Sequence, residues 1–137
     1  MSRMSQPRPL MLAICLSATL FQVAPSVAED APPLRVSYGQ CLDKTQGVTL
    51  EINNCIGTEF DFQDHRLNVA YKELRKTLPE AQRATLRDEE RIWIADRDKA
   101  CAPDADGGTA DMLGANECKL NRTAVRAAEL EAQRHHP

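Results

Sequence analysis

The chain has 137 residues, with 17 Lys and Arg against 20 Asp and Glu, so its formal net charge at pH 7 is −3. A chain of this length forms one small domain whose core alone gives marginal stability. An acidic balance argues against nucleic acids and anionic membranes as partners, and it favours basic partners.

Residues 1–28 have the pattern of an export signal. Arg3 and Arg8 give a positive start, an apolar run covers residues 10–21, and small residues precede a predicted cleavage site after Ala28. The run is too short to cross a bilayer, so we expect no membrane anchor. Because the signal carries two arginines and no acid, the mature chain has 15 basic and 20 acidic residues, a net charge of −5. We expect a soluble protein that is periplasmic or secreted.

Residues 29–48 contain proline, glycine and little periodicity, so we expect an N-terminal arm here. A helical domain over residues 49–134 should follow. Its first helix begins at Thr49, and its apolar stripe is interrupted by the polar Gln63 and Asp64. The stripe consists of Ile52, Cys55 or Ile56, Phe60, Leu67, Tyr71, Leu74 and Leu78.

The second helix is predicted to start around Thr77 and Pro79, because threonine caps helices well and proline is tolerated in a first turn. It runs to about Ala100. Thr109 is expected to cap a third helix that frays near its end. No β pattern appears, so the predicted fold is all-α, with three antiparallel helices and short connections. The inward face of the second helix holds Leu86, Glu90, Trp93, Arg97 and Ala100, and that of the third holds Leu113, Asn116 or Glu117, Leu120, Thr123 or Ala124, Ala127 and Leu130.

The four cysteines that follow the signal form an even set in an exported chain, which predicts two disulfides. Cys41 can join the arm to Cys55 in the first helix. Cys101 can reach Cys118 because the loop between them reverses the chain. Each bond closes a loop of about 15–18 residues and contributes about 3 kcal/mol. The sequence alone leaves two other connectivities open.

Residues suited to catalysis or metal binding are scarce. The mature chain has a single serine, Ser37, and His65 is the only histidine inside the predicted fold. The stretch DADGGTAD resembles a calcium loop, but Thr109 replaces its obligatory glycine and Ala115 its bidentate glutamate. We therefore expect no catalytic residue, no cofactor and no metal site, and we predict that the protein is not an enzyme.

The stretch DEERIWIADRDKAC places the only tryptophan among charged residues. On a helix, Trp93 shares a face with Glu90 and Arg97. A buried arginine needs an anionic partner, because an unpaired ion in a core is strongly destabilising. We expect Arg97 to pair with Asp64 and Arg126 to pair with Glu90, so that the ions orient three helices around Trp93.

Several segments, taken in order, resemble the N-terminal domain of the LprI-type lysozyme inhibitors, a family of small exported bacterial proteins. They are LNVAYKEL at 67–74, RIWIADRDKAC at 91–101, the pair Gly107 and Gly108, Cys118, TAVRAAEL at 123–130, and Cys41 and Cys55 with Thr49 and Glu51 between them. The resemblance covers about residues 38–131. It implies a helical, disulfide-bonded domain and structural roles for motif residues such as Asn68 and Tyr71. This chain departs from the family pattern in having Glu90 in place of glutamine and Asp96 in place of an aromatic residue.

The export signal and the helical pattern predict an exported binding protein, and the resemblance implies that it inhibits a basic lysozyme by binding to its surface. An acidic surface attracts a basic enzyme, so we expect the contact on the outward face of the second helix, at Asp88 and Asp96. The alternative is a structural or envelope-stress protein that binds a cell-wall component or another protein.

Overall fold

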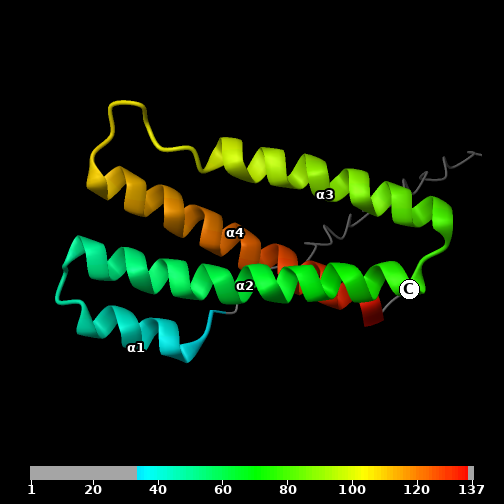
Figure 1. Cartoon of the computed structure of the whole chain (residues 1–137), viewed down its shortest axis with the longest axis horizontal. Coiled ribbons are helices and arrows are strands. Elements are labelled where there is room, and N and C mark those ends of the chain that lie inside the picture. Colours follow the sequence, from blue (N-terminus) through cyan, green and yellow to red (C-terminus); the bar gives the residue numbers. More distant parts are fainter. Residues whose placement is uncertain (1–33, 136–137) are drawn as a thin grey trace, which may run out of the picture.

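The computed structural model describes residues 34–135, and helices account for most of them (Figure 1). They are α1 (Val36–Lys44), α2 (Thr49–Thr77), α3 (Glu80–Ala100) and α4 (Thr109–His135). No strand occurs within residues 34–135, so the all-α prediction is confirmed. The predicted cleavage site after Ala28 lies outside the described residues. None of the described helices is both long and apolar enough to cross a membrane.

The predicted count of three helices is wrong, because part of the expected arm folds as α1. Tyr38 is only 8% exposed, and Cys41 and Leu42 pack against the same apolar cluster. These residues follow an i, i+3, i+4 spacing for little more than one turn, which is too short to stand out from the surrounding sequence. A helix of this length is not stable alone, so tertiary contacts must stabilise it.

The core lies mainly between α2 and α4, which run in the same direction (Figure 1). Asn53 contacts Asn116 near the start of both helices, and Arg66 contacts Glu131 further along both. Consecutive helices are antiparallel as predicted, whereas the largest interface joins two helices that are not consecutive. The side chains of α4 that are fully buried are Leu120, Thr123, Ala124, Ala127 and Leu130.

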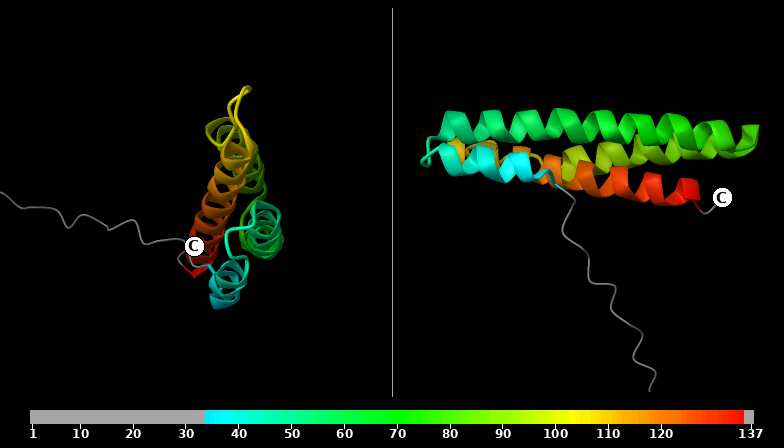
Figure 2. Two further views of the ribbon diagram at one scale, coloured as in Figure 1. Left: turned by 90° about the vertical axis from the view of Figure 1, so that its left-hand side faces the viewer. Right: turned by 90° about the horizontal axis from the view of Figure 1, so that it is seen from below.

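Helix α3 lies lengthwise along the molecule beside α4 (Figures 1 and 2). Its only buried residues are Leu86 and Glu90. Trp93 is half-buried and packs against the cluster that contains Leu86 and Leu130. The predicted inward face is therefore correct through Arg97, but Ala100 is exposed.

The helix boundaries depend on short connections. Gln46 (φ 48°) and Gly47 (φ 83°) adopt left-handed backbone conformations between α1 and α2, where glycine is favoured. Thr77 is the last residue of α2, and its hydroxyl donates to the Leu74 carbonyl at 2.8 Å. The prediction that Thr77 caps the next helix is thus wrong, since Pro79 occupies the N-cap of α3. Likewise, Thr109 is the first helical residue of α4 and not a residue before it.

Candidate binding surface

Both predicted disulfides are confirmed. Cys41 bonds to Cys55 with their Cα atoms 5.8 Å apart, and Cys101 bonds to Cys118 with a Cα separation of 5.5 Å. Both separations are typical of disulfides. The first bond joins α1 to α2, and the second joins the end of α3 to α4.

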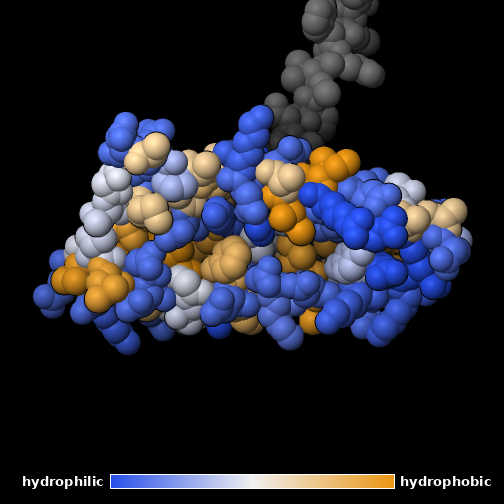
Figure 3. Space-filling view, turned by 45° about the horizontal axis from the view of Figure 1, so that its top comes forward, coloured by the Kyte–Doolittle hydropathy of each residue, from blue (hydrophilic) through white to orange (hydrophobic). Residues whose placement is uncertain are grey.

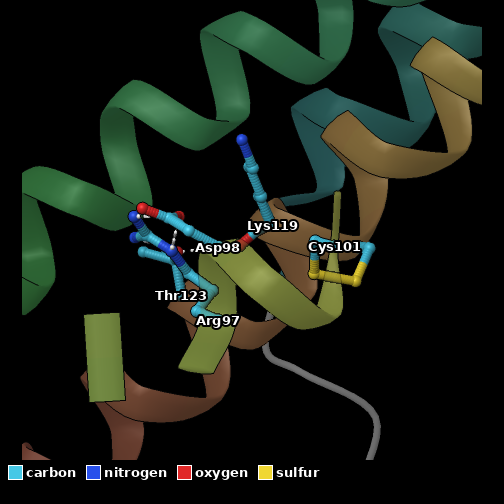
Figure 4. Close-up of a disulfide and its surroundings, with 6 residues drawn as sticks. Arg97, Asp98, Cys101, Lys119 and Thr123 are labelled. Atoms are coloured by element: carbon cyan, nitrogen blue, oxygen red, sulfur yellow. Dashed lines mark hydrogen bonds and ion pairs between the residues drawn. A yellow bond between two sulfur atoms is a disulfide. The ribbon is translucent and has the colours of Figure 1, made fainter. Parts of the chain in front are cut away.

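The predicted ion pair between Asp64 and Arg97 is wrong. Nε and Nη2 of Arg97 donate to the neighbouring Asp98 at 3.0 and 2.9 Å, and Nη1 reaches the Thr123 hydroxyl of α4 at 3.3 Å (Figure 4). Its guanidinium carbon also lies 5.2 Å from the centre of the Trp93 ring, a cation–π distance. Arg97 is only 12% exposed, and it turns toward α4 because that helix is the main neighbour of α3.

Asp64 instead belongs to a local contact within α2. Its carboxylate accepts a hydrogen bond of 2.9 Å from the amide of Asn68, one helical turn later. Tyr71 is half-buried against the core cluster, with Arg75 over its ring at 5.5 Å. Asp64 and Asn68 therefore act within α2, whereas Tyr71 packs on the cluster that also contains Leu86 of α3.

The second predicted pair is present. Arg126 of α4 donates to the buried carboxylate of Glu90 from Nε at 2.9 Å and also from Nη2, and it donates to Glu129 at 2.8 Å. Burial acts to lower the pKa of Arg126, but the hydrogen bonds to both glutamates outweigh it, so its pKa is raised. Glu90 and Arg126 thus form one of the polar anchors of α3.

The sequence analysis missed a polar chain through the α2 interface. Glu59 is 1% exposed and accepts hydrogen bonds from the backbone and side chain of Arg35 at 3.0 and 2.7 Å and from Gln63 at 2.8 Å. Gln63 in turn accepts from Arg66 at 3.0 Å, and Arg66 donates to Glu131 of α4 at 2.7 Å. Burial of these groups is tolerable because each one is hydrogen-bonded. The polar break at Gln63 in the predicted apolar stripe was the available signal.

The expected partner-binding residues lie on a face of mixed charge. Asp88 is exposed and lies 3.0 Å from Arg87 and 3.8 Å from Arg91. A hydrogen bond from Arg87 holds the pKa of Asp88 below its ordinary value. Asp96 is exposed and makes no ion pair with any residue of the described part. Residues 80–99 carry six acidic and five basic residues, so the field of α3 is weak.

Negative charge is concentrated elsewhere, in the half of the molecule where α2 and α4 begin. Residues 45–65 and 100–118 contain eight Asp and Glu and no Lys or Arg, whereas the remaining described residues have 15 Lys and Arg against 10 Asp and Glu. The two segments are far apart in sequence but lie at the same end of the molecule (Figure 1). We call this region the acidic half. A scan for long stretches without lysine or arginine would have detected both segments.

An apolar groove lies between α2 and α4 in the acidic half. Its inner hollow, of about 210 Å³, adjoins an outer one of about 390 Å³. Both hollows include Asn53 and Asn116, whose side chains hydrogen-bond across the two helices at 2.8 Å. Leu50 and Met112 line the outer hollow and are 68% and 49% exposed. Figure 3 shows apolar side chains at this end of the molecule, bordered by hydrophilic ones.

The aspartate-rich loop before α4 is closed by its own side chains. Asp111 accepts a hydrogen bond of 2.6 Å from the backbone of Asp104. Gly107 allows this approach, because a Cβ at that position would lie 2.8 Å from the Cβ of Asp111. No group of three metal-ligand side chains occurs among the residues that the structure describes. The contact therefore ties the loop to the first turn of α4.

Comparison with protein families matches residues 41–130 to the family described as Lysozyme inhibitor LprI. The matched region begins at the first cysteine of the fold and includes all four, together with the end of α1, all of α2 and α3, and α4 as far as Leu130. No curated protein and no solved structure matches the chain.

Proposed function

The chain belongs to the lysozyme inhibitor LprI family, and we propose that it binds a basic lysozyme outside the cytoplasm and blocks access to the substrate cleft. Its two disulfides support this location, because such bonds persist in oxidising compartments. Inhibition by surface binding needs no chemistry from the inhibitor. It requires a rigid surface that is complementary to the enzyme.

The observation that carries the proposal is the separation of charge. The acidic half contains two segments free of lysine and arginine, and of their acidic residues only Glu59 is buried, in an ion pair with Arg35. A surface of one sign speeds the encounter with a partner of the opposite sign and orients it. We therefore assign the lysozyme contact to the acidic half. A contact at Asp88 and Asp96 on α3 remains the competing prediction.

Inhibition of cell-wall hydrolysis by the mature, oxidised protein tests the function. We expect a basic lysozyme to be slowed at low salt and to be released as salt rises, because the Debye length falls from about 10 Å at 0.1 M to about 3 Å at 1 M. If a folded micromolar sample leaves hydrolysis unchanged at low salt, the inhibitor proposal is wrong and the structural alternative is preferred.

Two matched double reversals distinguish the surfaces. Glu51→Lys with Asp61→Lys changes exposed residues in the acidic half, and Asp88→Lys with Asp96→Lys changes exposed residues on α3. Both variants alter the net charge equally. We expect the first to weaken association roughly tenfold or more and the second to have a smaller effect. The opposite order, at unchanged thermal stability, would place the contact on α3.

A further inference from the structure

We propose that the α2–α4 groove receives an apolar side chain that a cationic partner protein presents between basic residues. The identity of the partner as a lysozyme rests on the proposed function. The chemistry of the site does not, because it follows from the shape, the apolar lining and the charge around the groove.

The lining of the groove is suited to an apolar anchor. Leu50 and Met112 are exposed on opposite helices at the outer hollow, while Ile56 and Phe60 line the inner one. Helix α1 packs through Tyr38 and Cys41 on the cluster that also includes Ile56, but Leu50 and Met112 stay exposed. Protein interfaces concentrate their binding energy where an anchor residue fills such a hollow.

The inner hollow is open because residue 57 is glycine. A Cβ built at Gly57 would meet no atom within 4 Å, so there is open space where a side chain at this position would begin. Beside it, Nδ2 of Asn116 donates to Oδ1 of Asn53. The other amide atoms, Nδ2 of Asn53 and Oδ1 of Asn116, make no hydrogen bond within residues 34–135, so they can bond to the backbone of a docked segment.

The charge around the groove selects a cationic occupant. Glu51 follows Leu50 in α2, and the loop that leads into α4 contributes Asp104 and Asp106, all three exposed. Lys119 is the one basic residue that lines the groove, at the inner hollow, where it extends from α4 toward α2 (Figure 4). None of the residues that line the outer hollow is charged, so the basic residues of the partner should lie over the exposed acidic residues that adjoin its lining in sequence, with the apolar side chain between the helices.

Filling the inner hollow tests the inference, and the chain offers a matched control. Gly57→Leu places an apolar side chain in the hollow. Gly114→Leu adds the same side chain to an exposed glycine of α4 that has open space around it. Gly114 lies about 200° around the helix from Met112, on the other side of α4 from the outer hollow. Both variants should keep the wild-type helix content and unfold at or above the wild-type temperature, because leucine favours helix more than glycine does.

Binding is measured with a basic lysozyme and with two synthetic peptides, one with leucine between lysines and one with serine in its place. We expect Gly57→Leu to weaken binding of lysozyme and of the leucine peptide roughly tenfold, and Gly114→Leu to leave both unchanged. Met112→Ser should also weaken binding, because Met112 lines the outer hollow. Equal binding by both glycine variants, or equal binding of the leucine and serine peptides, would overturn the inference.

The two proposals fail in different ways. If the wild type and Gly57→Leu inhibit lysozyme equally, the groove is not the contact although the function stands. If lysozyme is not bound but the leucine peptide binds the wild type and not Gly57→Leu, the function fails and the groove stands. If the wild type binds neither probe, both proposals are wrong.

Discussion

Helices α2 and α4 hold each other through a continuous buried interface, whereas α3 is attached at separate points along its length. In α4, five side chains from Leu120 to Leu130 are completely buried. In α3, only Leu86 and Glu90 are buried, and the remaining attachments are Trp93, Arg97 and the disulfide at Cys101.

The difference shows that helix length does not determine how strongly a helix is held. Helix α3 has 21 residues, yet most of its side chains face solvent, and Leu86 and Trp93 are the large apolar side chains among its anchors. Buried apolar area stabilises in proportion to the area removed from water, whereas exposed ion pairs contribute little. We therefore expect α3 to open more readily than the α2–α4 pair.

The largest effect should come from the buried interface. Leu120 is 0% exposed, so Leu120→Ala should lower the free energy of unfolding by about 2–5 kcal/mol, through lost burial and the cavity left behind. Urea denaturation of the oxidised protein measures this change. Ile92→Ala, at a position of α3 that is 63% exposed, should change it by about 0.5 kcal/mol or less. Equal losses would contradict the comparison.

Removal of one disulfide should release α3 selectively. Cys101→Ser with Cys118→Ser should lower the free energy of unfolding by about 3 kcal/mol. Amide hydrogen exchange should speed up more in α3 and in the loop that follows it than in α2 or α4. The matched variant, Cys41→Ser with Cys55→Ser, should loosen α1 instead. If both variants exchange uniformly over the whole chain, the helices open as one unit.

Trp93 should contribute less than a fully buried tryptophan. Trp93→Ala should cost about 1–3 kcal/mol, below the range of about 3–5 kcal/mol for a buried ring, because the side chain is only half-buried. Thermal and urea unfolding give the value. A loss above this range would show that α3 is held as firmly as α4.

Arg97 and Asp64 should act independently, because Arg97 contacts Asp98 and Thr123 while Asp64 contacts Asn68. The effects of Arg97→Met and Asp64→Asn on unfolding should add to within about 0.5 kcal/mol. In contrast, Arg97→Met and Thr123→Val should be coupled. A strong coupling between Arg97 and Asp64 would restore the pair expected from sequence.

The smallest effect concerns the exposed side of α3. Arg87→Gln removes the hydrogen bond that lowers the pKa of Asp88, so that pKa should rise toward its ordinary value in an NMR titration. Because the pKa of Asp88 is lower in the folded state, its charged form stabilises the fold at any pH above the unfolded-state pKa. This contribution is lost as the pH falls through the folded-state pKa. Since both residues are exposed, the unfolding temperature at neutral pH should hardly change. A clear drop would mean that exposed pairs hold α3.

Several features followed from local signals in the sequence. The start of α2 at Thr49, the end of α3 near Ala100 and the apolar stripe of α4 were predicted from periodicity. The even number of cysteines predicted two disulfides, and the pairing of neighbours along the chain, one of three possible connectivities, is the one found. The pair Glu90 and Arg126 followed from the need to compensate a buried charge.

The sequence by itself determined the features that depend on residues close along the chain: three long helices and the presence of two disulfides, with their connectivity left open. Only the tertiary structure decided that the largest interface joins α2 to α4, that Arg97 meets Thr123, and that residues of two acidic segments line one groove. These features join residues separated by 26 to 65 positions. Periodicity defines the inward face of each helix, but the partner of that face is chosen by how all the helices pack together.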